Sequence, residues 1–236
     1  MKRKKDKSSG NNNSKLKNCF FIFDDFLERD IADELYKSIL NNDFEKLPFI
    51  HKQDIDREKD LINKVLYDTW FDKLSFLNDK DICGFEVWSN LMYETGLHLH
   101  VDCDEDYYHL TQIIQPPKYT SVFYAGPDNH LDGGELALNL NGIEYAENHD
   151  LDHNQHDAIE NKQKNCISEM QAHLIRQDTQ NWFTIPYKYN RLIVFDSHYP
   201  HCVLNIKKGT TKNTPRIGIT MAAWDHEVSI QTNDER

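Results

Sequence analysis

The decisive stretch of this sequence is Gly96-Leu97-His98-Leu99-His100-Val101-Asp102. We expect a β-strand over 98–102, in which successive side chains point to opposite faces. His100 and Asp102 then share one face, where both can reach a single metal ion. They cannot enclose it, and His201, about a hundred residues later in Pro200-His201-Cys202-Val203, offers a third ligand. Two His and one carboxylate on one side of a metal leave positions open, which suits non-haem Fe(II) and oxygen chemistry.

The bulk composition is typical of one soluble globular domain. The chain has 236 residues, of which 39% are hydrophobic and 28% charged, so it can bury one sizeable core. No apolar run approaches the length of a membrane span, and no secretory segment follows the N-terminus. The formal net charge of −12 disfavours sequence-independent binding to nucleic acid. We therefore expect no membrane contact, and the composition leaves the oligomeric state open.

The cysteines indicate a reducing compartment. They are five in number, an odd count, and none has CxxC spacing: Cys19, Cys83, Cys103, Cys166 and Cys202. Reduced thiols and a cytoplasmic location follow as the expectation. Cys103 and Cys202 each adjoin a proposed metal ligand, and strand alternation predicts that both point away from the metal.

The N-terminal part of the chain is expected to supply a tail, a strand and two helices. Residues 1–17 have the composition of a disordered basic tail, with nuclear targeting as the alternative reading. A strand is expected at 19–23. Apolar residues at helical spacing predict a helix from Asp30 to about Asn41 and a second helix over about 57–76. Their buried faces would carry Ile31, Leu35 and Ile39 in the first, and Leu61, Val65, Leu66, Trp70 and Leu74 in the second.

From Cys83 onwards the apolar pattern changes to the period of a strand. The expected strands are 84–93, 98–102, 121–125, 135–140, 191–197, 201–206 and 216–224. Many short strands separated by turn residues predict a sandwich or barrel. We predict an α+β, mainly β fold over 18–236: a double-stranded β-helix, or jelly roll, braced on one face by the N-terminal helices.

Region 141–184 interrupts the strand pattern and is predicted to be an insertion. Its His-rich run 148–157 could bind a second metal, although a mobile surface loop is the favoured interpretation. A helix is expected over about 157–177, because Ile167, Met170, Leu174 and Ile175 have helical spacing. We expect this helix to lie over the barrel mouth, where the insertion would select the substrate as a lid.

The order of motifs along the chain supports a family resemblance. The segments that carry it are Phe21–Leu27 followed by a helix, Tyr93-Glu94-Thr95-Gly96, His100-Val101-Asp102, Ser121–Tyr124, Gly133-Gly134-Glu135-Leu136, Asn190–Phe195, His201-Cys202-Val203 and Pro215–Thr220. This series resembles the Fe(II)- and 2-oxoglutarate-dependent dioxygenases, in particular the prolyl 4-hydroxylase-like branch. The resemblance covers about residues 19–225, with 141–184 unmatched.

The resemblance implies an iron site and a co-substrate residue. His100 and Asp102 match the HxD motif, and His201 matches the distal His, so these three would be the iron ligands. Arg216 matches the basic residue that pairs with the distal carboxylate of 2-oxoglutarate, a task for which a planar guanidinium is suited. Arg216 lies further after His201 than is usual in the family, which implies a longer loop over 207–214, and Arg191 is the alternative.

The resemblance also implies further residues of the co-substrate pocket. Tyr93 and Tyr124 match strand tyrosines that often line it. Gly218 stands where the family often has a small hydroxyl residue, so Thr220 would have to supply any hydroxyl contact.

Other polar residues compete with these assignments. His98 shares a face with His100 but falls outside the HxD register, so we interpret it as a neighbour of the site. His198 competes with His201, which alone is followed by the strand that the family pattern requires. Asp196 is either an acceptor for a ligand His or a turn-starting residue. Gly133-Gly134 is interpreted as a turn.

The implied activity is oxidation by a dioxygenase. The resemblance implies Fe(II), 2-oxoglutarate and O2 as cofactor and co-substrates, with ascorbate as a further candidate, and release of succinate and CO2. The substrate would be a protein or peptide side chain, an amino acid or another small molecule. The carboxylate ligand Asp102 favours hydroxylation over halogenation. The alternatives are a non-catalytic metal-containing jelly-roll binding module and a zinc hydrolase, since the same donors bind zinc.

Overall fold

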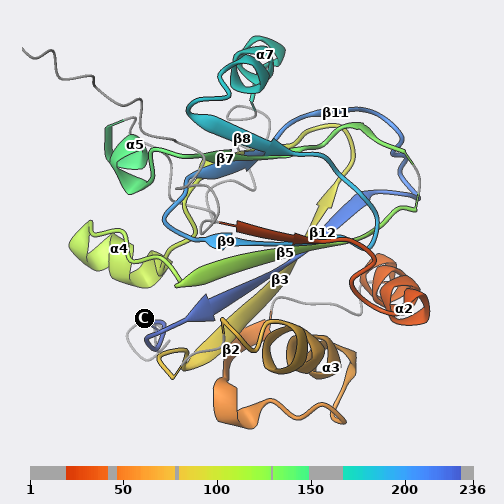
Figure 1. The fold of residues 1–236 in the computed structure, drawn as a ribbon, viewed down its shortest axis with the longest axis vertical. Helices are drawn as coiled ribbons and strands as arrows, with labels where there is room; N and C mark the ends of the chain where they lie inside the picture. The colour runs from red at the N-terminus through yellow and green to blue at the C-terminus, as the bar shows by residue number, and fades with distance from the viewer. Residues whose placement is uncertain (1–19, 42–46, 78–79, 129, 149–166, 230–236) are drawn as a thin grey trace, which may run out of the picture.

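The computed structural model describes residues 20–41, 47–77, 80–128, 130–148 and 167–229. Two antiparallel sheets pack face to face at its centre (Figure 1). The larger sheet has the order β1 (Phe20–Phe23), β9 (Leu192–Asp196), β5 (Tyr119–Gly126), β12 (Arg216–Trp224), β3 (Gly84–Met92) and β2 (Leu47–His51). The smaller sheet has the order β4 (Leu97–His100), β10 (His201–Val203), β7 (Leu136–Asn139) and β8 (Trp182–Ile185), and a separate ribbon pairs β11 (Ile206–Lys208) with β6 (Asp132–Gly133). The predicted mainly β, jelly-roll architecture is confirmed.

Helices cover the outer face of the larger sheet, as predicted. They are α2 (Arg29–Leu40) and α3 (Leu61–Tyr67), the latter continued by the π-helix η2 (Asp68–Lys73). Leu35 and Trp70 from these helices pack against Phe123 of β5 within one apolar core. The second helix is shorter than predicted because it begins at Leu61, where the Asp60 carboxylate accepts a hydrogen bond from the Asn63 amide.

Strand β12 contributes side chains to both faces of the larger sheet. All nine of its residues are buried. Ile217 and Ile219 belong to the core beneath the helices. Because alternate residues point to opposite faces, Arg216, Thr220 and Trp224 face the smaller sheet. This inner face is the wall on which the candidate site is built.

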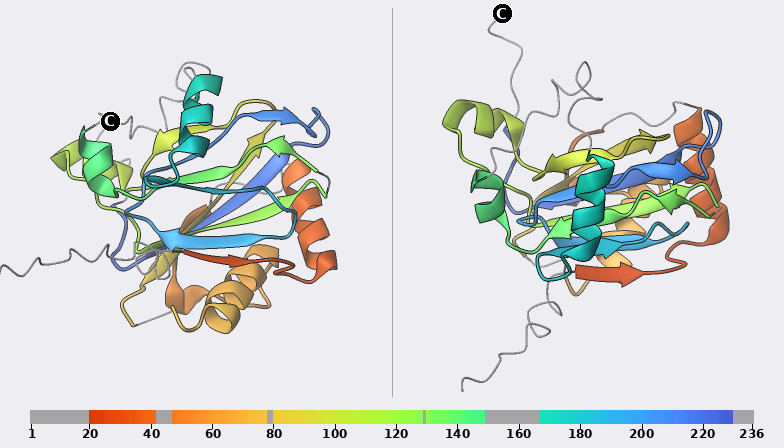
Figure 2. Two further views of the ribbon diagram at one scale, coloured as in Figure 1. Left: turned by 45° about the horizontal axis from the view of Figure 1, so that its top comes forward. Right: turned by 90° about the horizontal axis from the view of Figure 1, so that it is seen from above.

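Helix α7 (Glu169–Gln177) corrects one prediction. It lies across the outer face of the smaller sheet and not over the mouth (Figure 2). Its buried residues are Ala172 and Ile175, which pack with Cys202 of β10, whereas Met170 and Leu174 are exposed. The apolar spacing identified the helix, but Ala172 was not counted among its apolar positions. The first part of the predicted helix, the His-rich run after Asn148 and the tail 1–17 lie outside the described residues.

Several boundaries and elements also differ from the prediction. The expected strand 98–102 ends at His100, and 201–206 is divided between β10 and β11. The short elements β2, β6 and β8, the 3-10 helix η1 (Lys52–Asp54), and the helices α4 (Glu105–Thr111) and α5 (Ile143–Asn148) were not expected. Figures 1 and 2 show α4 and α5 near each other at one end of the sandwich. None of the described helices has the length and apolar character needed to cross a membrane.

Candidate active site

Three buried side chains meet between the two sheets. His100 ends β4 and His201 begins β10, and the two residues are direct partners in the antiparallel pairing of these strands. Their ring centroids are 4.3 Å apart. Asp102 follows β4 and returns to the same place: its carboxylate oxygens lie 3.4 Å from His100 Nε2 and 3.7 Å from His201 Nε2. The potential ligand atoms of all three lie within 4.8 Å of one another, so the predicted metal ligands are brought together.

Backbone carbonyls orient both imidazoles for metal binding. His100 Nδ1 lies 2.9 Å from the carbonyl oxygen of His98, and His201 Nδ1 lies 3.2 Å from that of Tyr199. A carbonyl oxygen only accepts hydrogen bonds, so each Nδ1 carries the proton. The Nε2 lone pairs are then available next to Asp102, which is the tautomer that a metal-binding His needs.

Hydroxyl groups from the larger sheet hold the Asp102 carboxylate. Thr120 Oγ1 on β5 donates to Asp102 Oδ2 at 2.9 Å and lies 2.8 Å from Ser197 Oγ. Burial by itself raises the pKa of Asp102, but His201, His100 and Thr120 outweigh burial and hold it at about 2. Burial and the neighbouring His100 lower the pKa of His201 to about 4. At neutral pH the site therefore presents an anionic carboxylate beside a neutral His201.

This donor set fits a divalent transition metal. Two imidazole nitrogens and one carboxylate on one side of an ion form the set used by non-haem Fe(II) sites, and it also suits zinc. The ligands come from the smaller sheet and the segment after it, while their support comes from the larger sheet.

Arg216 is the second unusual feature of the inner wall. Its side chain is 1% exposed, and its Nε and Nη2 have no hydrogen-bond partner among the described residues. Nη1 donates to the Met92 sulfur at 3.3 Å. The guanidinium lies over the ring of Tyr124 at 4.6 Å, and the buried Tyr124 hydroxyl likewise has no partner in the described chain. A buried charge without an anion is costly, so this geometry fits a carboxylate ligand such as the distal end of 2-oxoglutarate.

Two glycines leave room around the guanidinium. Gly134 has φ +72°, and a Cβ there would lie 3.3 Å from Arg216 Cδ. A Cβ on Gly218 would lie 3.6 Å from Arg216 Nη1. The Gly133-Gly134 turn therefore also shapes the surroundings of Arg216. Thr220 is buried two positions after Gly218 on the same face of β12.

Not every predicted pocket residue lies with this group. Tyr93 follows the last residue of β3 and is 42% exposed, whereas Tyr124 is fully buried beside Arg216. Tyr187, which no sequence pattern indicated, stacks on Tyr124 with ring centroids 5.1 Å apart, and its ring centroid lies 5.8 Å from the Arg216 guanidinium. Tyr187 Oη donates to the Pro127 carbonyl at 2.6 Å. Tyr187 lies in the unpatterned stretch before β9, where no strand alternation could assign its face.

The alternative residues have other partners. Arg191 binds the Asp24 carboxylate through Nε at 2.6 Å and Nη2 at 3.1 Å. His198 is exposed and pairs with Asp196 at 2.8 Å, so Asp196 orients His198 and not a residue of the triad. His98 lies beside the triad, with its ring centroid 5.2 Å from that of His100.

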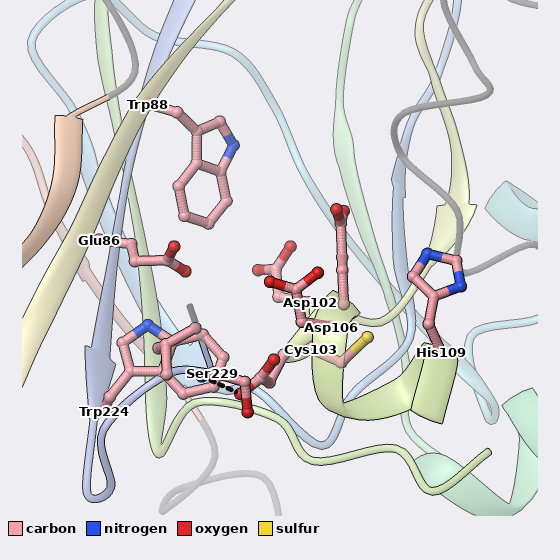
Figure 3. A pocket seen from close by; sticks show the side chains of 11 residues that line it. Glu86, Trp88, Asp102, Cys103, Asp106, His109, Trp224 and Ser229 are labelled. Atoms are coloured by element: carbon pink, nitrogen blue, oxygen red, sulfur yellow. Dashed lines mark hydrogen bonds between the residues drawn. The ribbon is translucent and has the colours of Figure 1, made fainter. Parts of the chain in front are cut away.

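A pocket of about 170 Å³ opens next to the triad (Figure 3). Asp102 belongs to both the triad and the pocket wall. The remaining lining residues come from β3, from α4 and the turn before it, from the last residue of β12 and from the end of the described residues: Glu86, Trp88, Cys103, Asp104, Glu105, Asp106, His109, Trp224, Val228 and Ser229.

Comparison with solved structures identifies the fold. The chain is similar to a prolyl 4-hydroxylase from Pseudomonas putida, with a TM-score of 0.53, 15% sequence identity and coverage of 94% of this chain and 92% of that chain. A 2OG-Fe(II) oxygenase family oxidoreductase from Burkholderia pseudomallei also matches, with a TM-score of 0.47, 12% identity and coverage of 90% and 88%. The collagen prolyl hydroxylase of Paramecium bursaria Chlorella virus-1, solved with 2OG, matches with a TM-score of 0.47 and 15% sequence identity. The match covers 87% of this chain and 96% of that chain.

Sequence comparison adds nothing to this result, since no family model and no curated protein matches the chain. The identification therefore rests on the fold and on the local geometry. The chain shares the fold of the Pseudomonas putida prolyl 4-hydroxylase, and it holds a buried His-Asp-His triad between the two sheets of that fold.

Proposed function

We propose that the protein is an Fe(II)- and 2-oxoglutarate-dependent dioxygenase that hydroxylates an amino acid, a protein side chain or another small molecule. The observation that carries this proposal is the presence of two buried features between the two sheets. A buried triad with two imidazoles and a carboxylate suits iron. A buried guanidinium, with donors that no described residue satisfies, suits the distal carboxylate of 2-oxoglutarate.

Each residue has a distinct role in this proposal. His100, Asp102 and His201 would hold Fe(II). Arg216 would bind and orient the co-substrate, and the unpartnered Tyr124 hydroxyl would donate to it. Iron, 2-oxoglutarate and O2 together supply the oxidising chemistry, which yields succinate, CO2 and a hydroxylated product. The protein supplies ligation, orientation and a site that excludes water.

Arg216 separates this function from the alternatives. A zinc hydrolase uses the same three ligands but has no need of a buried, unpaired guanidinium nearby. A metal-containing binding module without turnover would bind metal yet form no succinate. Both alternatives make predictions that differ from those of a dioxygenase.

The proposal is tested by the visible spectrum of the protein with Fe(II) and 2-oxoglutarate in the absence of oxygen. A charge-transfer band is expected in the wild type, because the keto acid would chelate the iron. His201→Ala should abolish the band, whereas His198→Ala should retain it, because His198 is exposed and outside the triad. Absence of the band in wild-type protein with bound metal would overturn the proposal. Succinate formation on admission of air then distinguishes turnover from binding alone.

A further inference from the structure

We propose that the substrate carries a cationic group, an ammonium or a guanidinium, which binds in the pocket beside Asp102. This inference rests on the proposed function, because it treats that pocket as the substrate site. It follows from three independent features of the pocket: the charge of its walls, its aromatic residues and a buried donor that lacks a partner.

The walls of the pocket are acidic. Apart from Asp102, which is assigned to the metal, they contain four carboxylic acids and no Lys or Arg among the described lining residues: Glu86, Asp104, Glu105 and Asp106. An anionic substrate would be repelled here, and a cationic one attracted.

One of these acids has a structural role and is not assigned to the ligand. The Asp104 carboxylate accepts hydrogen bonds from the amides of Tyr107 at 2.9 Å and Ser229 at 2.6 Å. It therefore caps α4 and fastens the end of the described chain. Glu86, Glu105 and Asp106 contribute the other negative charges of the pocket wall.

Two indoles complete the wall on the side of the larger sheet. The register of β3 and β12 puts Glu86 and Trp88 on one pleat face beside Trp224. Figure 3 shows the Glu86 carboxylate between Trp88 and Trp224, across the pocket from Asp102 and Asp106. Indole faces beside a carboxylate attract organic cations by cation–π and Coulomb interactions.

Trp224 supplies the observation that points to a ligand. The residue is 1% exposed, and its Nε1 donor has no hydrogen-bond partner among the described residues. In Figure 3 the ring nitrogen lies on the side of the pocket that contains Glu86. A buried donor of this kind needs an acceptor, which the amide carbonyl of a basic amino acid or peptide provides.

The inner face of β12 separates the two ligands by charge. Arg216 begins this strand and Trp224 ends it, a span of about 26 Å for eight residue steps. Thr120, which holds Asp102, is paired with Ala222, between these two ends. The Arg216 end of this strand face would accept the anionic co-substrate, and the acidic pocket at the Trp224 end would accept the cationic substrate.

The test compares matched probes on the complex of protein, Fe(II) and 2-oxoglutarate without oxygen. Nα-acetyl-lysine methylamide and its arginine analogue are titrated against the norleucine and citrulline analogues, and binding is followed by perturbation of the charge-transfer band. We expect each cationic probe to bind about tenfold or more tightly than its neutral isostere, equivalent to about 1.4 kcal/mol. Glu86→Gln should reduce this preference, and Glu34→Gln, which changes an exposed residue of α2, should not.

The possible outcomes separate the two proposals. If the band forms but the cationic and neutral probes bind equally, or if no probe perturbs the band, the charge inference is wrong and the dioxygenase proposal stands. If the band never forms with metal bound, the proposed function itself fails. A preference that survives both Glu86→Gln and Asp106→Asn would also overturn the assignment to this pocket.

Discussion

At the scale of single residues, Thr120 links the metal site to the larger sheet. It is fully buried, and its hydroxyl contacts both Asp102 and Ser197. Its partner Asp102 would otherwise be a buried carboxylate held only by the two imidazoles. Such outer groups fix the orientation and charge of a metal ligand.

Thr120→Val is expected to weaken metal binding while keeping the fold. Valine has nearly the same shape as threonine but cannot donate to Asp102 Oδ2, so affinity for Fe(II) or its redox-inert substitute Mn(II) should fall by about 10- to 100-fold. Calorimetric titration of the metal checks this. Ser121→Ala is the matched control, because this neighbouring buried hydroxyl donates to the Met221 carbonyl instead. Equal metal affinity in wild type and Thr120→Val would contradict the role assigned to Thr120.

Arg216→Met is expected to stabilise the fold and to weaken the binding of 2-oxoglutarate. The ligand-free protein keeps a guanidinium buried without an anion, so a long apolar side chain is expected to raise the free energy of unfolding by about 1–3 kcal/mol. The same change should weaken 2-oxoglutarate binding by about 100-fold, through loss of charge-assisted hydrogen bonds. Thermal unfolding with and without 2-oxoglutarate measures both effects. A variant that is less stable and still stabilised by 2-oxoglutarate would contradict this account.

Sequence patterns indicated the candidate site residues that lie in motifs and regular strands, but not those placed only by tertiary packing. Strand alternation and motif order indicated His100, Asp102 and His201, which the fold brings together, and Arg216, which begins β12 on its inner face. They could not assign a face to Tyr187, which lies outside the regular strands with its ring centroid 5.8 Å from the Arg216 guanidinium. Nor could they show that Trp224 and Glu86 share a pocket with Asp102, since this depends on the packing of two sheets.

At the scale of elements, the pairing of β4 with β10 creates the triad. His100 and His201 are about a hundred residues apart in the chain and become neighbours only through this register. The sequence indicated most strands and the N-terminal helices because their apolar periods are clear. It did not reveal β2, because this strand contains Pro48, a residue that argues against a strand. Proline lacks an amide donor, which is tolerated here because β2 lies at the edge of the sheet.

Helix α7 is attached to the smaller sheet by an ion pair of two parallel hydrogen bonds. Arg176 Nε and Nη2 lie 2.9 and 3.0 Å from the two carboxylate oxygens of Glu135. Burial alone raises the pKa of Glu135, but Arg176 outweighs burial and lowers it below its usual 4.5. Because the folded pKa is lowered, the pair stabilises fully above about pH 4.5, and this stability is lost as the pH falls through the folded pKa.

Glu135→Gln should therefore lower the free energy of unfolding by about 1–2 kcal/mol at pH 7, with the difference from wild type disappearing in acid. Urea unfolding at a series of pH values measures this effect. The exposed pair of Lys207 and Glu169 offers a control, because Glu169→Gln should have little effect at any pH. A Glu135→Gln difference that grows in acid would have the wrong sign for this explanation.

At the scale of the whole molecule, the two-sheet sandwich combines helix-covered outer faces with an interior in which buried polar residues lie beside an apolar cluster. The N-terminal helices and α7 cover opposite outer faces, and the inner faces hold the triad, Arg216 and the acidic pocket. Composition and strand spacing were sufficient to predict this architecture. The position of α7 was not predictable, because helical periodicity identifies a buried face but not the surface that it packs against.

The central claim is that the triad and Arg216 form one site for a metal and 2-oxoglutarate. It is tested most directly by titrating 2-oxoglutarate calorimetrically into the protein without metal and with Mn(II). The account predicts that Mn(II) tightens 2-oxoglutarate binding by about 100-fold, that 2-oxoglutarate tightens Mn(II) binding by the same factor, and that His201→Ala removes this coupling. An affinity for 2-oxoglutarate that is independent of the metal would contradict it.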